Sequence, residues 1–127
     1  MPINIFFILA STSQSRILIL KRLNLNFKTT KPNCNESYYK KKFKKLKYSP
    51  QRISLELSKN KAKSISLKTK NKLIIGADTV INFKGKISEK AKNLKQARQK
   101  IKKLSGKKHT IISSVAAYYN RKLVWSY

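Results

Sequence analysis

The chain has 127 residues, of which 31 are Lys or Arg and only 4 are Asp or Glu, so its formal net charge is +27. A hydrophobic fraction of 40% is typical of a globular domain, which excludes a wholly disordered chain and allows one domain with a core. Cys34 is the single cysteine, which excludes an internal disulfide framework and a cysteine-clustered zinc site, and fits a reducing, cytoplasmic setting.

The net charge supports two interpretations. A basic surface can bind phosphates, RNA or acidic lipid. However, only 5 of the 31 basic residues are Arg and the excess is spread over the whole length, whereas nucleic-acid binders usually gather basic residues on one face and favour Arg. The charge alone therefore does not separate a functional surface from compositional drift.

The first apolar run, residues 3–10, predicts a buried strand. It is too short to span a bilayer and lacks the basic start of a signal peptide. A polar turn follows, and then residues 17–23 predict a helix with Ser11 or Ser13 as its N-cap. Residues 25–30 resemble a short second strand.

The Lys-rich segment at 31–50 has little periodicity, so we expect a connecting loop. Within it, residues 38–48 mix aromatic and Lys side chains, a pattern that can stack on and pair with single-stranded nucleic acid. A solvated basic loop would account for the same residues.

In the next part of the chain, a Ser-Pro pair and apolar residues at helical spacing predict a helix over 50–67. Residues 72–83 predict a strand that runs into a second strand, with a turn or bend at 76–78. The glycine in 83–86 predicts a hairpin turn.

The last part predicts a helix that starts at Asn93 and ends before Gly106, then a long strand at 109–119 and a final strand at 123–127. Strands that alternate with helices indicate an α/β fold. A sheet ending on the strand at 123–127 would leave an exposed edge, so we expect the chain to be incomplete at this end.

Asp78 is the only aspartate, and it follows buried strand residues. The carboxyl ends of strands are where open α/β sheets bind ligands, so a metal ligand or a general base for water would explain it. An Asx turn or a helix cap is the structural alternative. Ser11, Ser13 and Arg16 follow the first strand and could hold a phosphate at a helix start, although a simple N-cap would also place serines there.

Five segments follow one another along the chain: ILASTSQSRILILKRL, NCNES, LELSKNKAKSI, LIIGADTVINFKGKISEKAKN and IKKLSGKKHTIISSVAAY. Their order and spacing resemble the Maf family of nucleoside triphosphate pyrophosphatases, and the pair GADTV and LSG-x-x-H is specific. The resemblance covers nearly the whole chain. It implies a Maf- and ITPase-like mixed twisted sheet flanked by helices, in one domain over 1–127 that is incomplete at the C-terminus.

The resemblance also implies a house-cleaning hydrolase that cuts dTTP, UTP or modified nucleotides between the α and β phosphates, using Mg²⁺ or Mn²⁺. The products are the monophosphate and pyrophosphate. Catalytic and metal-binding roles fall on Asp78, as the base that activates water, and on Glu36. Substrate- and phosphate-binding roles fall on Ser11, Ser13, Arg16, Lys61, Thr79 and Lys90. Thr79 resembles the branch that acts on dTTP and UTP.

Several positions depart from the family pattern. Gln14-Ser15 stands where the family usually has Pro-Arg, and Asn35 stands where an Asp is typical. Glu89-Lys90-Ala91 replaces the usual Gly-Lys-Pro, and Ser114 occupies a position that is normally Gly or Ala. Family members also continue well past the position of Tyr127. We therefore expect the 127-residue chain alone to be weakly active or inactive, which release of pyrophosphate from dTTP or UTP would measure.

Two other hypotheses stay open at this point: a small basic nucleic-acid-binding protein that uses residues 38–48, and a non-catalytic remnant. Salt-dependent binding of RNA or DNA that is insensitive to substitution of Asp78 would favour the first, and a molten spectrum would favour the second. For the enzyme we expect a nucleotide substrate, no membrane partner, only non-specific binding of nucleic acid, and a homodimer as a possible assembly.

Overall fold

Six strands form one mixed sheet in the computed structural model, which describes residues 5–88 and 91–127. The elements in chain order are β1 (Phe6–Ala10), α1 (Gln14–Arg22), β2 (Asn26–Thr29), α2 (Glu36–Lys45), α3 (Pro50–Ser66), β3 (Leu73–Phe83), β4 (Lys86–Ile87), α4 (Leu94–Leu104), β5 (Thr110–Tyr119) and β6 (Lys122–Ser126). The strand order is β2-β1-β3-β5-β6, and β4 pairs with β3. The predicted α/β fold class is confirmed.

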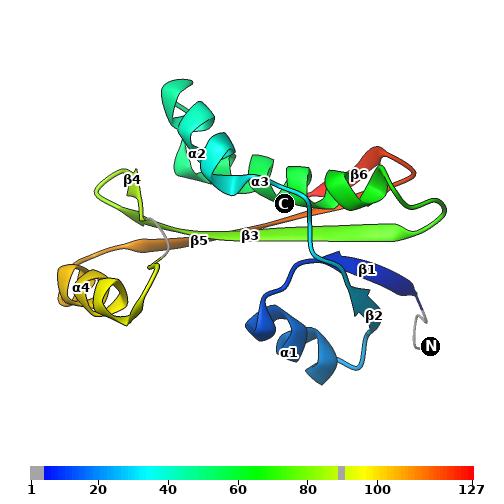
Figure 1. Ribbon diagram of the computed structural model, residues 1–127, viewed down its shortest axis with the longest axis horizontal. Coiled ribbons are helices and arrows are strands. Elements are labelled where there is room, and N and C mark those ends of the chain that lie inside the picture. The colour runs from blue at the N-terminus through cyan, green and yellow to red at the C-terminus, as the bar shows by residue number, and fades with distance from the viewer. Residues whose placement is uncertain (1–4, 89–90) are drawn as a thin grey trace.

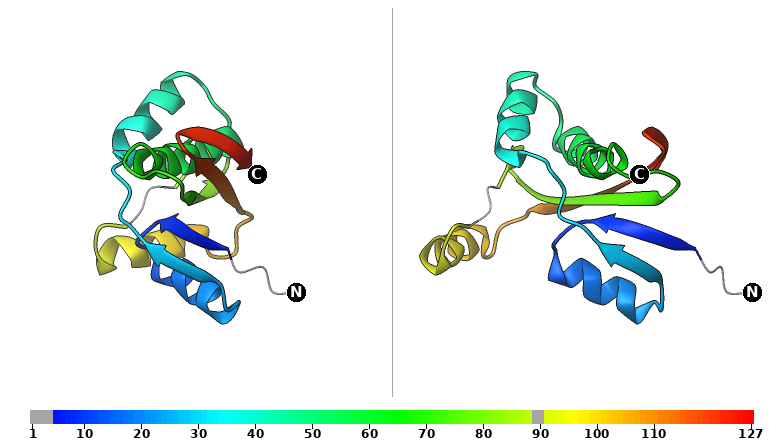
Figure 2. Two further views of the ribbon diagram at one scale, coloured as in Figure 1. Left: turned by 90° about the vertical axis from the view of Figure 1, so that its right-hand side faces the viewer. Right: turned by 45° about the vertical axis from the view of Figure 1, so that its right-hand side comes forward.

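The helices lie on both faces of this sheet. Figures 1 and 2 show α2 and α3 on one face and α1 and α4 on the other. β1 runs parallel to both β2 and β3, while β5 runs antiparallel to both β3 and β6. The long pair β3–β5 extends past β1 and carries β4 and α4 at its far end (Figure 1).

The core lies between α3 and the sheet. Ser49 caps α3, its hydroxyl accepting a hydrogen bond from the Arg52 backbone nitrogen at 3.2 Å, and Pro50 occupies the first turn as predicted. The buried face of α3 contributes to two apolar clusters. One contains Ile8, Ala10, Ala62, Ile65, Ile74 and Tyr118, and the other contains Phe43, Ile53, Leu57, Val80 and Ile87.

Gly76 allows α3 to approach the sheet between these two clusters. Alternate residues of β3 face α3, and Gly76 is one of them, between Ile74 and Asp78. A Cβ atom at position 76 would overlap the Ser58 carbonyl oxygen and lie 2.8 Å from the Ala62 backbone nitrogen. Both of these atoms belong to the backbone of α3, so the close packing requires glycine.

Two sequence predictions are wrong. Residues 31–50 are not a loop throughout, because α2 forms there, with Asn35 as N-cap and Phe43 buried. Residues 76–78 do not form a turn or bend, because β3 continues unbroken to Phe83. The pairing of β3 with β5 runs from Leu73 to Asn82 and includes all of this stretch.

Other predicted elements are confirmed. Ser13 caps the first helix, which starts at Gln14, three residues earlier than expected. The helix that begins after Asn93, the Gly85 hairpin turn and the final strand are all present. Among the described residues, no helix is long and apolar enough to cross a membrane.

Candidate active site

A buried lysine joins two carboxylates at the centre of the sheet face that α3 covers. The Lys61 Nζ atom lies 3.0 Å from Asp78 Oδ1 and 2.8 Å from Glu36 Oε1. The side chains of Lys61 and Asp78 are 6% and 5% exposed, and that of Glu36 is 27% exposed. The three side chains thus link α3, β3 and the start of α2, and Glu36 is the most solvent-exposed of the three.

Asp78 is not at the end of its own strand, as the sequence had suggested. It lies within β3, opposite Ser114 of β5. The neighbouring strand β1, however, pairs with β3 only as far as Ala10 and Gly76. Asp78 is therefore two residues beyond the point where β1 leaves the sheet, and the segment that follows β1 reaches the same place.

Ser54 and Ser114 form a hydroxyl network beneath Asp78. Their Oγ atoms are 2.8 Å apart, Ser114 Oγ donates to the Ser54 carbonyl at 2.7 Å, and Ser54 Oγ donates to the Asp78 carbonyl at 3.4 Å. All three residues are buried. This network fixes the backbone of Asp78 against α3 and accounts for a hydroxyl at position 114.

The second carboxylate oxygen of Asp78 has no hydrogen-bond partner among the residues that the structure describes. Oδ2 is buried, while Oδ1 accepts from Lys61. A buried acceptor without a partner is costly, so it marks a place where a cation or a protonated group would be stabilised.

Arg16 organises a second polar group, around residues that follow β1. Its guanidinium donates to Ser11 Oγ at 3.2 Å and to Thr79 Oγ1 at 3.3 Å. Thr79 Oγ1 lies 3.1 Å from the Ser113 hydroxyl. Ser13 Oγ accepts from the Arg16 backbone nitrogen at 3.4 Å as the α1 N-cap. The structure thus brings the predicted Ser11, Ser13, Arg16 and Thr79 together.

One hollow joins the Arg16 group to Asp78. Its volume is about 660 Å³, and Ser13, Arg16, Thr79 and Asp78 are all part of its lining. The remaining walls are largely apolar and come from β1, β3, β5 and α1. Lys61 of α3 contacts Asp78, and Glu36 of α2 contacts Lys61. The predicted Lys90 lies outside the described residues.

Lys40 is a further charged residue at this site that the sequence reading missed. It lies one helical turn after Glu36 in α2, and its Nζ atom is 4.0 Å from Glu36 Oε2. Its side chain is only 9% exposed. The i, i+4 spacing from Glu36 was the available signal, but it carries weight only once the segment is known to be helical.

The single cysteine borders the ion pair. Burial raises the pKa of the Cys34 thiol above its ordinary value, and the charges of Glu36 and Asp78 raise it further, while Lys61 opposes them. The thiol is therefore protonated at neutral pH, which makes it a poor nucleophile and a poor metal ligand.

Asp78 and Glu36 are the residues that could hold a metal. Among the described residues, no group of three or more His, Cys, Asp or Glu side chains is arranged to bind one. Mg²⁺ needs no such group, because it often binds one or two carboxylates and takes its other ligands from substrate phosphates and water. The unpartnered Asp78 Oδ2 and the nearby Glu36 carboxylate fit this kind of site.

The aromatic residues of segment 38–48 are mostly used for packing. Phe43 is buried and stacks with Tyr39 and Tyr48, at ring centroid distances of 5.7 and 5.3 Å. The Arg52 guanidinium covers Tyr48 at 3.7 Å from the ring centroid. Tyr38, 57% exposed, is the aromatic residue of this segment that remains open to solvent. The structure therefore does not favour this segment as a stacking platform.

Comparison with known proteins finds a family match and relatives that cover most of this chain. Residues 6–126 match the family described as Maf-like protein. A protein named "Nucleoside triphosphate pyrophosphatase" from Pelagibacter ubique is 37% identical over 120 residues, which cover 94% of this chain and 62% of the relative. A "7-methyl-GTP pyrophosphatase" from Bartonella henselae is 34% identical over 118 residues, which cover 93% and 59%.

A third relative is named "dTTP/UTP pyrophosphatase" and comes from Thermosipho melanesiensis. It is 39% identical over 108 residues, which cover 85% of this chain and 54% of the relative. The chain therefore spans 54–62% of the length of these three curated relatives.

Proposed function

This chain belongs to the Maf-like protein family, and from that premise we propose that its site serves the hydrolysis of nucleoside triphosphates to the monophosphate and pyrophosphate. The proposal extends to this chain the activity for which its relatives are named. The observation that carries it is the buried Asp78 carboxylate, with one oxygen held by Lys61 and the other without a partner in the described part of the chain.

Asp78 is the proposed general base. Attack of water on phosphorus requires a group that orients the water and accepts its proton, and a carboxylate can do both. The Lys61 ion pair fixes the Asp78 side chain in one orientation and leaves Oδ2 as the carboxylate oxygen that would accept the proton. Asp78 is part of the lining of the hollow, so a phosphate chain bound there would lie near this residue.

Arg16, Ser13 and Lys61 are the proposed phosphate-binding groups, with Lys90 added from the family resemblance. A guanidinium can bind phosphate oxygens through two hydrogen bonds, and the start of α1 offers backbone N–H groups beside it. These cations would neutralise charge on the phosphates, which is the main requirement of phosphoryl transfer. Ser11 holds the guanidinium in place through its Oγ atom.

Mg²⁺ or Mn²⁺ is the proposed cofactor, with Asp78 and Glu36 as its protein ligands. When bound, such an ion neutralises phosphate charge and lowers the pKa of water. Lys61 lies between the two carboxylates, at the place where their charges converge. Its positively charged ammonium group therefore partly neutralises the negative charge of the two carboxylates.

Thr79 supports dTTP or UTP as the preferred substrates within this proposal. Its hydroxyl is fixed between Arg16 and Ser113 at the rim of the hollow, where it can contact a substrate. The apolar walls of the same hollow suit a nucleoside, since small-molecule sites combine apolar surface with a few polar groups.

The metal site can be tested at equilibrium. Replacing Glu36 by Gln removes one proposed ligand charge, so we expect the dissociation constant for Mn²⁺ to rise about tenfold or more. Electron paramagnetic resonance of free Mn²⁺ during a titration measures this directly and does not depend on turnover.

Glu56→Gln is the matched control. Within residues 5–88 and 91–127, Glu56 forms its ion pair with Lys59 one turn along α3, at 3.4 Å, and this pair is partly exposed. Its removal should leave Mn²⁺ affinity within about twofold, because a surface pair contributes little. Equal affinities for the Glu36 and Glu56 variants would exclude Glu36 as a metal ligand.

The proposal also includes a cytoplasmic location and a homodimer. The single, half-buried Cys34 supports a reducing compartment. The exposed Val124 and Trp125 on the edge strand β6 support association between copies, since an uncovered apolar edge favours pairing with another chain.

A further inference from the structure

Lys40 of α2 is a buried lysine that the proposed reaction does not yet use. Its side chain is only 9% exposed, and its Nζ atom lies 4.0 Å from Glu36 Oε2. The other oxygen of Glu36 is 2.8 Å from Lys61 Nζ. At 4.0 Å the Lys40 contact is an ion pair but is longer than a hydrogen bond, so it leaves N–H donors of Lys40 for another acceptor.

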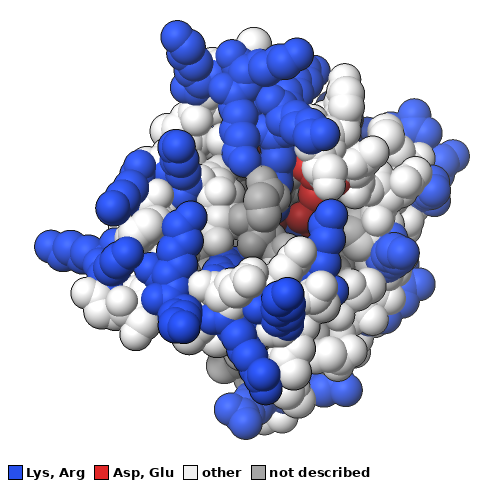
Figure 3. Space-filling model, turned by 60° about the vertical axis from the view of Figure 1, so that its left-hand side comes forward, with Lys and Arg blue, Asp and Glu red and all other residues white. Residues whose placement is uncertain are grey.

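A hollow of about 480 Å³ lies beside this lysine, and we call it the Lys40 hollow. Glu36, Ser37 and Lys41, from the same helix, are also part of its lining. Figure 3 shows a face of the molecule on which acidic atoms are confined to one small area, with Lys and Arg side chains beside it. Ammonium and hydroxyl groups around one hollow are the donors that a phosphate group binds.

The Lys40 hollow and the hollow of about 660 Å³ described above border the same ion-paired group. Glu36 is part of the lining of the first, and Asp78 is part of the lining of the second. Lys61 joins these two carboxylates, at 2.8 and 3.0 Å. A ligand that occupied both hollows would therefore pass beside Lys61.

The proposed reaction needs a cation at its leaving group. Water attacks the α phosphorus, and the bond from that phosphorus to the oxygen bridging to the β phosphorus breaks. The electron pair of this bond stays on the bridging oxygen, so negative charge grows on the departing pyrophosphate, while Asp78 takes the proton of the water. Cations placed beside developing charge stabilise the transition state of phosphoryl transfer.

We propose that Lys40 binds the pyrophosphate portion of the substrate, in the Lys40 hollow together with Ser37. The nucleoside then occupies the hollow that borders Asp78, where Arg16 is left for the α phosphate. This inference rests on the proposed function and adds to it the place of the leaving group and a substrate-binding residue.

The test measures equilibrium binding of two ligands to the full 127-residue chain by isothermal titration calorimetry. MgCl₂ is present, and NaCl at about 150 mM screens long-range attraction to the basic chain. Methylenediphosphonate represents the departing pyrophosphate, and UMP represents the other product. Lys40→Gln should raise Kd for methylenediphosphonate about tenfold, because it removes a charged hydrogen-bond donor. Kd for UMP should change less than about twofold, which shows that the variant is folded.

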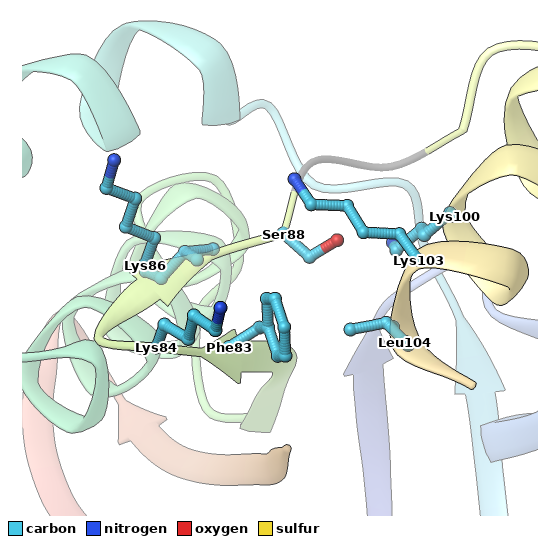
Figure 4. Close-up of a pocket in the computed structure, with 8 residues that line it drawn as sticks. Phe83, Lys84, Lys86, Ser88, Lys100, Lys103 and Leu104 are labelled. Carbon is cyan, nitrogen blue, oxygen red and sulfur yellow. The ribbon is translucent and has the colours of Figure 1, made fainter. Parts of the chain in front are cut away.

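Lys84→Gln is the control with the same change of charge. Lys84 borders a different hollow, of about 280 Å³ between the β3–β4 hairpin and α4 (Figure 4), and the described residues that line it include neither Glu36 nor Asp78. Its replacement should leave both Kd values within about twofold of those of the unsubstituted chain.

Three results would overturn this inference and leave the proposed function standing. They are equal losses of methylenediphosphonate binding in the Lys40 and Lys84 variants, unchanged binding by Lys40→Gln, and an unsubstituted chain that binds UMP but not methylenediphosphonate. An unsubstituted chain that binds neither ligand would contradict the proposed function, and this inference with it.

Discussion

Replacing Asp78 by Asn is expected to lower turnover of UTP and dTTP by about 10²- to 10⁴-fold, the range that general bases contribute. The amide has nearly the same shape but cannot accept a proton from water. The fold should survive, because Lys61 keeps Glu36 at 2.8 Å and the amide oxygen can still accept its hydrogen bond. Loss of activity with unchanged circular dichroism would therefore identify a chemical role.

A hybrid protein provides the assay for this variant. The chain spans 62% of the Pelagibacter ubique relative, so it can replace the matching segment of that protein and be tested with the remainder in place. Glu56→Gln in the same hybrid is the control, because Glu56 also lies on α3 but its ion pair is with Lys59 and not with the Lys61 group. An Asp78→Asn hybrid that retains more than about a tenth of the activity would rule out a general base at this position.

Replacing Gly76 by Ala is expected to destabilise the fold by about 3 kcal/mol, at the upper end of overpacking effects. The added methyl group would collide with the Ser58 carbonyl oxygen and the Ala62 nitrogen. These are helix backbone atoms, so no side-chain rotation relieves the contact and α3 must move away from the sheet. Such a loss is a large part of the 5–15 kcal/mol that is typical of small domains.

Gly106→Ala separates this steric effect from the general cost of losing a glycine. Gly106 has a φ of +68°, but a Cβ atom there would meet nothing within 4 Å. Its replacement should cost about 1 kcal/mol, from backbone conformation alone. Urea denaturation of both variants measures the difference, and a Gly76→Ala protein as stable as Gly106→Ala would show that α3 does not pack as closely as described.

The sequence predicted those elements whose local signals agree with their packing. For α3, the Ser-Pro start and the spacing of Leu57, Ala62 and Ile65 indicated both the helix and its buried face. For α4, the Asn93 cap and apolar spacing indicated the helix correctly. These signals did not predict how exposed α4 is. Ile101 lies on the apolar face of the helix, but its side chain is 69% exposed.

α2 could not be predicted because its stability depends on tertiary contacts. Five of its ten residues are Lys, which hides the apolar periodicity. Phe43 packs in the cluster with Ile53 and Leu57 of α3, and this contact stabilises the helical conformation of α2. Asn35, whose side chain accepts from the Tyr38 nitrogen at 3.1 Å, was the local signal that could have revealed its start.

Gly76 and Asp78 led to the wrong prediction of a turn within β3. Both residue types are depleted in strands and common in turns. Here each has a partner outside the strand, since α3 backbone packs on Gly76 and Lys61 pairs with Asp78. The local preference was therefore overridden by contacts that also build the site.

The family resemblance named the site residues, but their grouping needed the structure. Alternate faces of β3 separate Asp78 from Thr79, so one joins Lys61 and Glu36 while the other joins Arg16. The Ser54–Ser114 pair connects residues 60 apart in sequence and had no local signal.

Product analysis of UTP hydrolysis by the hybrid protein shows directly which phosphoanhydride bond is cut and whether Asp78 is needed. Anion-exchange chromatography separates the products, and we expect UMP and pyrophosphate in equal amounts, formed only while Asp78 is present. Formation of UDP and inorganic phosphate, or equal UMP release by the Asp78→Asn hybrid, would contradict it.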